Sequence, residues 1–115
     1  MKNWAIFSIK GTGLISEEIT KFLEIKPDRV LFDEKEGIES WELISKSSGD
    51  ESIVKHIEEL LEKIYPLRKK IQNLSHRYEI RFICTIQREA MEFIEIPPKY
   101  LLILGSLGVK LIIYC

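Results

Sequence analysis

The most unusual chemical feature of this sequence is a cluster of acids between residues 33 and 42. Five carboxylates stand there against one base, Lys35. Carboxylates at this density attract a basic partner through long-range electrostatics, and a neighbouring tryptophan is a residue type that often anchors protein interfaces. The segment therefore predicts a partner-binding surface made of Asp33, Glu34, Glu36, Glu39, Trp41 and Glu42. The alternative is a solubilising loop beside an edge strand, with the tryptophan in its more usual place in the core.

A second candidate is Gly11-Thr12-Gly13, which lies between an expected strand and an expected helix. Backbone N–H groups at such a turn can bind phosphate. A nucleotide-binding fingerprint needs a third glycine, and Ser16 stands at that position. The favoured interpretation is a tight turn in which a glycine adopts a positive φ.

Metal-ligating residues are sparse. His56 and Glu59 are three residues apart and could share a metal ion, but the only other histidine is His76. Together with the distant cysteines Cys84 and Cys115, these residues make a poor zinc site. We expect no metal, and we expect His56 to pack and hydrogen-bond at the boundary of the core.

Catalytic patterns are also missing. The sequence holds neither a GxSxG motif nor a known catalytic cysteine motif, so we expect no catalytic residues and no cofactor. Cys84 falls on the apolar side of an expected strand, as an inert core thiol does. An enzyme would need a concave pocket with perturbed carboxylates, for which Glu92 and Glu95 are the candidates.

The charge balance argues against nucleic acid and membrane as partners. The net charge is −1, and Arg68-Lys69-Lys70 is a short basic run without interleaved aromatic residues. The two halves differ, since residues 1–62 hold 14 acids and 8 bases whereas residues 63–115 hold 4 acids and 9 bases. The halves can attract each other across the fold, or they can form a dipolar surface for a charged partner.

Length and composition predict one folded domain over residues 1–115. The chain is 45% hydrophobic and 30% charged, as ordinary folded proteins are. No apolar run approaches the roughly 20 residues needed to span a bilayer. Without a leader-like start or a disulfide framework, we expect a cytoplasmic protein with reduced thiols.

Hydrophobic periodicity and turn residues predict the element order β-α-β-β-α-β-β-α-β. The strands are expected at 4–9, 29–32, 40–45, 78–87, 91–96 and 109–114, the last of them in the interior of the sheet. Helices are expected from Ser16, from a cap at Ser48 or Asp50, and from Pro98.

Two residues are expected to end helices. Pro66 lacks an N–H group and should end or kink the long helix near residue 65, with room for a second, shorter helix. Gly108 should end the last helix in a left-handed conformation.

These elements predict an α+β fold, specifically a two-layer sandwich with a largely antiparallel sheet and helices on one face. The first six elements have the ferredoxin-like βαββαβ order, which a further β-α-β then extends.

Several segments together resemble the bacterial "domain of unknown function 4279" family over nearly the whole chain. The resemblance rests on Ile6-Phe7-Ser8-Ile9-Lys10-Gly11, Glu17-Glu18-Ile19-Thr20, Ile25-Lys26-Pro27, Trp41-Glu42-Leu43-Ile44-Ser45, His56-Ile57, Leu60-Leu61, Pro66 and Leu107-Gly108-Val109. The sequence departs from the family between Pro27 and Trp41, where many members carry a Gly-Lys-type segment. The resemblance implies no activity and no functional residue, although the settings of some members suggest immunity or partner-binding proteins.

The leading hypothesis is a non-enzymatic binding module, such as an immunity-type inhibitor, that covers a basic protein with the acidic segment 33–42. The alternative is a small-ligand sensor in which ferredoxin-like domains pair through sheet edges and bind a metabolite at the dimer interface. The first hypothesis is compatible with a monomer, whereas the second requires a homodimer.

Overall fold

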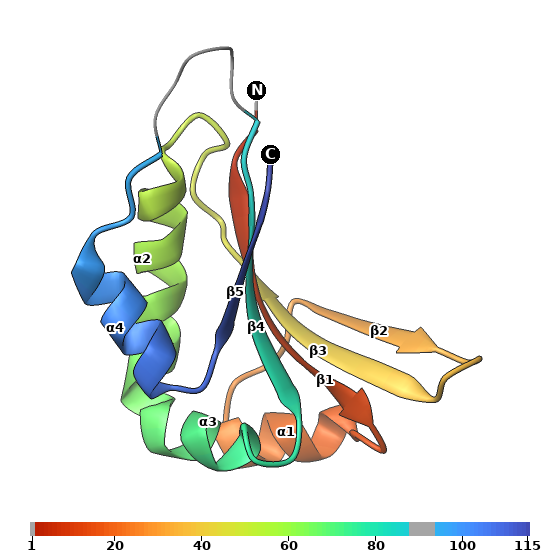
Figure 1. Ribbon diagram of the computed structural model, residues 1–115. Helices are drawn as coiled ribbons and strands as arrows, with labels where there is room; N and C mark the ends of the chain where they lie inside the picture. Colours follow the sequence, from red (N-terminus) through yellow and green to blue (C-terminus); the bar gives the residue numbers. More distant parts are fainter. Residues whose placement is uncertain (1, 88–93) are drawn as a thin grey trace.

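The computed structural model describes residues 2–87 and 94–115, which form an α+β fold with one five-stranded sheet (Figure 1). Along the chain the elements are β1 (Trp4–Thr12), α1 (Ser16–Leu23), β2 (Arg29–Asp33), β3 (Ile38–Ile44), α2 (Ile53–Ile64), the 3₁₀ turn η1 (Tyr65–Leu67), α3 (Arg68–Leu74), β4 (Glu79–Thr85), α4 (Pro98–Ser106) and β5 (Lys110–Tyr114). Within the described ranges, no helix is both long and apolar enough to pass through a membrane.

The sheet is mostly antiparallel, with the strand order β2-β3-β1-β4-β5. β1 pairs antiparallel with both β3 and β4, β2 pairs antiparallel with β3, and β5 pairs parallel with β4. The predicted antiparallel character is therefore confirmed. The expectation that the last strand is interior is wrong, because β5 forms an edge of the sheet in the described part of the chain, and its Ile113 and Tyr114 are exposed.

One face of the sheet carries the hydrophobic core. Alternate β1 side chains Ala5, Phe7 and Ile9 are completely buried there, and the register places Trp41 and Phe82 of the neighbouring strands on the same face. The helices pack against this face (Figure 1), with α1 reaching it through a hydrogen bond between its Thr20 and the Trp41 indole. The alternate β1 positions point to the opposite face, which the helices leave uncovered.

α1 begins at Ser16 as expected, but Ser16 is not its N-cap, and the cap expected for α2 at Ser48 or Asp50 is wrong. Ile15 is the N-cap of α1, and Ser52 is the N-cap of α2. The Ser52 hydroxyl accepts a hydrogen bond from the Lys55 N–H. Several cap-type residues precede α2 in a row, so composition alone does not choose among them.

The predicted breaks are confirmed. α2 ends at Ile64, and Pro66 lies in the 3₁₀ turn from which α3 continues. Gly13 and Gly108 both have positive φ, +77° and +72° respectively, as a tight turn and a helix terminator require.

The strand predicted over residues 91–96 lies only partly within the described residues. Residues 91–93 lie outside the described ranges, and residues 94–96 have no regular secondary structure, so that part of the prediction is wrong. The strand predicted over 78–87 is confirmed in its centre as β4, which is shorter at both ends.

Gly108→Ala and Gly105→Ala are expected to change stability in opposite directions. A Cβ atom at residue 108 would lie 2.9 Å from Ser75 Oγ at a left-handed φ, so we expect a loss of about 1–2 kcal/mol in the free energy of unfolding. Nothing lies within 4 Å of a Cβ at residue 105, where alanine favours the helix by about 0.5 kcal/mol. Urea denaturation of both variants checks the sign, and a destabilised Gly105→Ala protein would contradict the expectation.

Candidate functional site

The predicted acidic surface lies on a hairpin that extends away from the helical layer (Figure 1). β2 and β3 form this hairpin, which we call the arm. The turn between them is ordered by Asp33, whose carbonyl oxygen accepts from the Gly37 N–H at 2.9 Å and whose carboxylate accepts from the Lys35 N–H at 3.0 Å. Gly37 has φ +65°, which closes the turn. Asp33 therefore shapes the tip of the arm as well as charging it.

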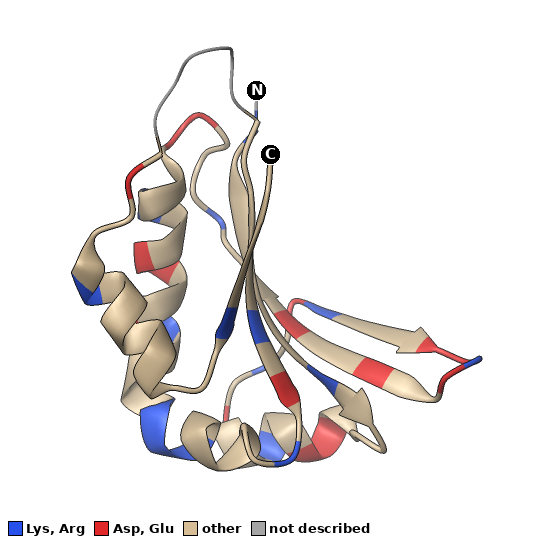
Figure 2. Cartoon of the chain, in the orientation of Figure 1, with Lys and Arg blue, Asp and Glu red and all other residues tan. Residues whose placement is uncertain are grey.

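The structure separates the predicted site residues into two groups. Asp33, Glu34 and Glu36 lie together at the exposed tip of the arm, where Figure 2 shows the acidic residues beside one base. Glu39, Trp41 and Glu42 lie on β3, where each is partly or fully buried. The six residues therefore do not form one surface.

Glu39 has a structural contact. Its Oε2 accepts from the N–H and the hydroxyl of Ser16, at 2.8 and 2.9 Å. Ser16 is the first residue of α1, where N–H groups have no partner within the helix. Glu39 therefore caps α1 from a neighbouring strand, and its negative charge suits the positive end of the helix dipole.

Trp41 lies in the core, as the alternative interpretation predicts. It is completely buried, and its Nε1–H donates to Thr20 Oγ1 at 3.0 Å. Glu42 is only 3% exposed and points to the face that the helices do not cover. Arg29 donates to Glu42 Oε1 through Nε at 2.7 Å and Nη2 at 2.6 Å, so this carboxylate is already paired.

The outer strand of the arm exposes three consecutive apolar side chains. Val30, Leu31 and Phe32 are 43%, 47% and 60% exposed. β2 is the edge of the sheet, so within the described part of the chain its outer backbone groups face no further strand. An apolar edge strand of this kind is a site where another strand can pair. The sequence already places the strand there, but only the sheet order identifies it as an edge.

The base of the arm is fixed by Asp28. Its Oδ2 accepts from the Ile44 N–H at 2.7 Å, and its Oδ1 lies 2.8 Å from Lys46 Nζ. Burial raises the pKa of Asp28, but these two contacts outweigh burial and hold the pKa of the carboxyl below its ordinary value. Asp28 therefore stays ionised at neutral pH and holds the arm in register.

The uncovered face of the sheet carries a charged row that the sequence analysis missed. The cross-strand register aligns one residue from each strand, in the order Arg29, Glu42, Ser8, Arg81 and Lys110. These residues are far apart in the sequence, and only the register brings them together. The one signal in the sequence is the polar position in the middle of the apolar strand β1.

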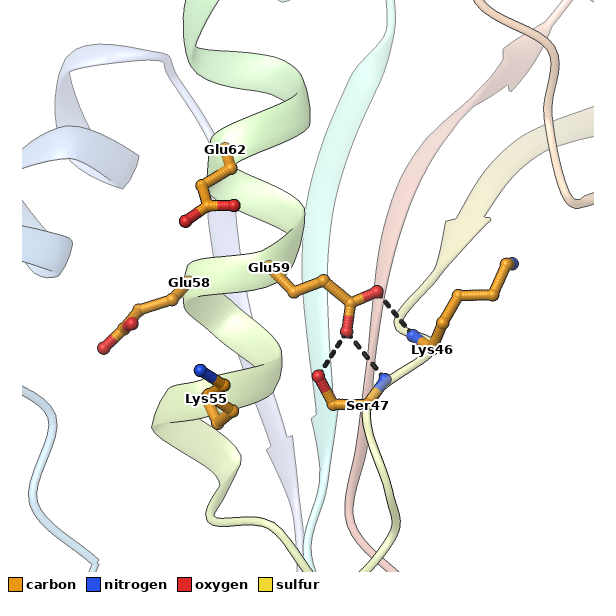
Figure 3. Close-up of a pocket in the computed structure, with 6 residues that line it drawn as sticks. All are labelled: Lys46, Ser47, Lys55, Glu58, Glu59 and Glu62. Carbon is orange, nitrogen blue, oxygen red and sulfur yellow. Dashed lines mark hydrogen bonds between the residues drawn. The ribbon is translucent and has the colours of Figure 1, made fainter.

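A pocket of about 350 Å³ lies on the outer side of α2 (Figure 3), lined by Lys46, Ser47, Lys55, Glu58, Glu59 and Glu62. Glu59 faces the β3–α2 loop, where its Oε1 accepts from the N–H and hydroxyl of Ser47 at 2.7 and 2.6 Å. Burial raises the pKa of Glu59, but the hydrogen bonds from Ser47 and Lys46 outweigh it and lower the pKa below its ordinary value. A carboxylate held ionised in this way anchors the loop and is unsuited to act as a general acid.

His56 is 1% exposed, and both ring nitrogens have partners. Nε2 lies 3.0 Å from the Ser48 carbonyl oxygen, and Nδ1 lies 2.7 Å from Ser45 Oγ, the oxygen that accepts from the Ala5 N–H. The network ties α2 to the sheet, as predicted for a histidine that packs and hydrogen-bonds. Burial raises the pKa of Cys84 to about 12, so this thiol is inert as predicted.

Among residues 2–87 and 94–115, no group of three or more histidine, cysteine, aspartate or glutamate side chains is arranged to hold a metal ion. Glu95, one of the two carboxylates considered for an enzyme, is exposed, and Glu92 lies outside the described ranges.

The sequence matches one family, described as "Domain of unknown function (DUF4279)", over residues 1–114. No curated protein matches the chain. No solved structure matches it either.

Glu39→Ala is expected to destabilise the protein, whereas Glu34→Ala is not. Loss of the cap leaves Ser16 N–H without its acceptor, which we expect to lower the free energy of unfolding by about 1 kcal/mol. Glu34 is exposed at the tip, so its replacement should stay within about 0.5 kcal/mol. Chemical denaturation compares the two, and equal effects would contradict the capping role.

Glu59→Gln is expected to lower stability at pH 7 by about 1 kcal/mol, because a neutral amide accepts more weakly from Ser47 and Lys46. A lowered pKa in the folded state stabilises the protein above the ordinary value of 4.5, and this contribution is lost as the pH falls below it. The difference between wild type and variant should therefore narrow below pH 4.5. Urea denaturation at pH 7 and pH 3.5 measures the free energy of unfolding of both proteins, with Glu62→Gln at an exposed position as control. The same difference between wild type and Glu59→Gln at both pH values would contradict a lowered pKa of Glu59.

Proposed function

The chain belongs to the DUF4279 family, described as a domain of unknown function, and we propose that it is a non-enzymatic protein-binding module whose arm recognises a basic protein. The observation that carries the proposal is the exposed apolar strand β2 at the edge of the sheet, next to an acidic tip.

The apolar part of the arm would supply the contact area. Val30 and Phe32 lie on one side of β2 and Leu31 on the other, so a partner strand added at this edge would meet apolar side chains on both sides. Pairing at a sheet edge also supplies main-chain hydrogen bonds, and alternate side chains then give specificity. This mode of binding requires an extended segment in the partner.

The acidic part would choose the partner. Asp33, Glu34 and Glu36 place three negative charges against the single positive charge of Lys35 at the tip. Such a field speeds association with a basic surface and repels acidic ones, and it also discourages pairing between two arms. The occupant that fits best is therefore an extended segment rich in lysine or arginine.

Glu39 and Glu42 are left out of this binding surface. Their carboxylates cap α1 and pair with Arg29, so neither is free to meet a partner. An immunity-type inhibitor that covers a basic target is one kind of protein that would act through the remaining surface. We place this activity in the cytoplasm, where the free thiols of Cys84 and Cys115 stay reduced.

We also propose that the fold is ferredoxin-like in its first four strands. The order β2-β3-β1-β4, with antiparallel pairing at each step, supports this assignment. The alternative function, a sensor that pairs through sheet edges, draws support from β5, whose Ile113 and Tyr114 are exposed at the other edge. It requires a dimer, which light scattering detects.

The proposal predicts that a basic protein is captured from a lysate of the native host by the wild type and lost when the tip is neutralised. The test variant combines Asp33→Asn, Glu34→Gln and Glu36→Gln, which removes the field and spares the cap at Glu39. We expect binding at least tenfold weaker, and wild-type binding that falls as salt rises.

A matched control combines Asp50→Asn, Glu51→Gln and Glu62→Gln, which neutralises three exposed acids outside the arm. A second variant, Leu31→Thr with Phe32→Thr, removes apolar area and retains β-forming residues. The proposal requires the control to bind like the wild type and the Thr variant to bind weakly. Equal recovery of the same protein by all four baits would contradict it.

A further inference from the structure

Arg81, on the uncovered face of the sheet, has a buried side-chain N–H for which the described residues provide no acceptor. Arg81 donates through Nη2 to Ser8 Oγ at 3.2 Å, while its Nε–H is buried and has no hydrogen-bond partner in the described part of the chain. Buried donors are almost always paired, and an unpaired N–H on a charged group is especially unfavourable. This geometry indicates a missing acceptor.

Neither neighbouring acid hydrogen-bonds to Arg81 in the described part of the chain, and both pair with other cations. Glu42 Oε1 accepts a hydrogen bond from Arg29 Nε and forms an ion pair with Arg29 Nη2. Glu79 accepts from Lys110 Nζ at 2.7 Å and lies 3.8 Å from Lys10 Nζ. The hydrogen bond from Lys110 lowers the pKa of Glu79, and the charges of Lys110, Lys10 and Arg81 add to this lowering. Within the described residues, the hydrogen bond of the Arg81 side chain therefore goes to a neutral hydroxyl and not to a carboxylate.

Ser8 completes the set of donors. It lies beside Arg81 in the register, is completely buried, and accepts from Arg81 while keeping its own hydroxyl proton to donate. The fork of Nε and Nη2 on an arginine matches the two oxygens of a carboxylate. A phosphate dianion would call for more than one uncommitted cation, and the nearby lysines are paired with Glu79.

An apolar row runs alongside the charged row. Two residues further along each strand, the register aligns Ile44, Ile6, Ile83 and Ile112 on the same face. Ile6 is almost fully buried and the other three are partly buried. A ligand held at Arg81 would therefore rest its remaining atoms on aliphatic side chains.

We infer that Arg81 and Ser8 form a binding site for a small carboxylic acid with an apolar body. This site lies on the uncovered face of the sheet, and it is independent of the arm and of the partner proposed for it. The carboxylate would take the buried Nε–H and the Ser8 hydroxyl proton, and the isoleucine row would bind the apolar body.

The test titrates octanoate against the full chain at constant ionic strength, with binding followed by NMR shifts of the Ser8 and Arg81 amides. We expect saturable shifts, weaker binding of acetate, and none of 1-octanol, which lacks the charge. Arg81→Met should weaken octanoate binding at least tenfold, whereas Arg68→Met, which removes an exposed arginine elsewhere, should not.

Stability provides a second readout that a purely structural arginine would not give. Since Arg81→Met removes an unpaired buried donor, the melting temperature without ligand should stay the same or rise, and octanoate should no longer increase it. Should Arg81→Met fail to fold, Ser8→Ala and Arg81→Lys test the inference in its place, and each should weaken octanoate binding.

Four results of the binding measurements would overturn the inference. They are no saturable binding of octanoate, equal binding by wild type and Arg81→Met, equal binding of octanol, or inorganic phosphate binding more tightly than octanoate. A dimer that Arg81→Met dissociates would also overturn it, because the missing acceptor would then be a carboxylate of a second copy of the chain.

Discussion

The antiparallel pairing of β1 with both β3 and β4 determines where the other parts of this protein lie. As the middle strand of the sheet, β1 is buried on both faces, so its alternate side chains must satisfy two different environments. Ala5, Phe7 and Ile9 face the helices and form the centre of the core. Ser8, between them, faces the other way and is a completely buried polar residue in the middle of the sheet. The position of α1 follows from this arrangement, since it packs on the Trp41 face and is capped by Glu39 of the same strand.

The arm forms because β3 pairs with a second strand, β2, on the side away from β1. β3 pairs with β1 along its whole length, Ile38–Ile44, and with β2 over residues 38–42, and the side chains of the outer strand β2 are exposed. The chain therefore combines a rigid base, fixed by Asp28, with an exposed apolar edge. Acids at the tip repel a second arm, and under the proposed function the same charges would select a basic partner.

Much of the fold could be predicted from the sequence because it depends on local periodicity. The alternation in β4, the apolar stripe of α2, the break at Pro66 and the terminator at Gly108 are all properties of short segments. The cap of α1 could not be predicted in this way, since its acceptor comes from Glu39, 23 residues away. The edge position of β5 was also missed, because apolar composition does not distinguish a strand covered on one side from one covered on two.

The candidate site could be predicted only in part, because its arrangement depends on cross-strand register and not on local periodicity. The acidic segment was visible as composition, but composition does not say which carboxylates are already committed. Glu42 looks like its neighbours in the sequence, and only the register shows that it faces Arg29. The charged row is wholly a product of register, since its five residues come from five strands.

The most direct test of the central claim, that β2 is the recognition edge, is amide hydrogen exchange with and without the captured partner. The account predicts that the amides of β2 exchange more slowly in the complex, because a partner strand would pair with their outer backbone groups. Amides of α2 and α4 should be unaffected. Protection confined to those helices, with β2 exchanging as in the free protein, would contradict the account and place the binding surface elsewhere.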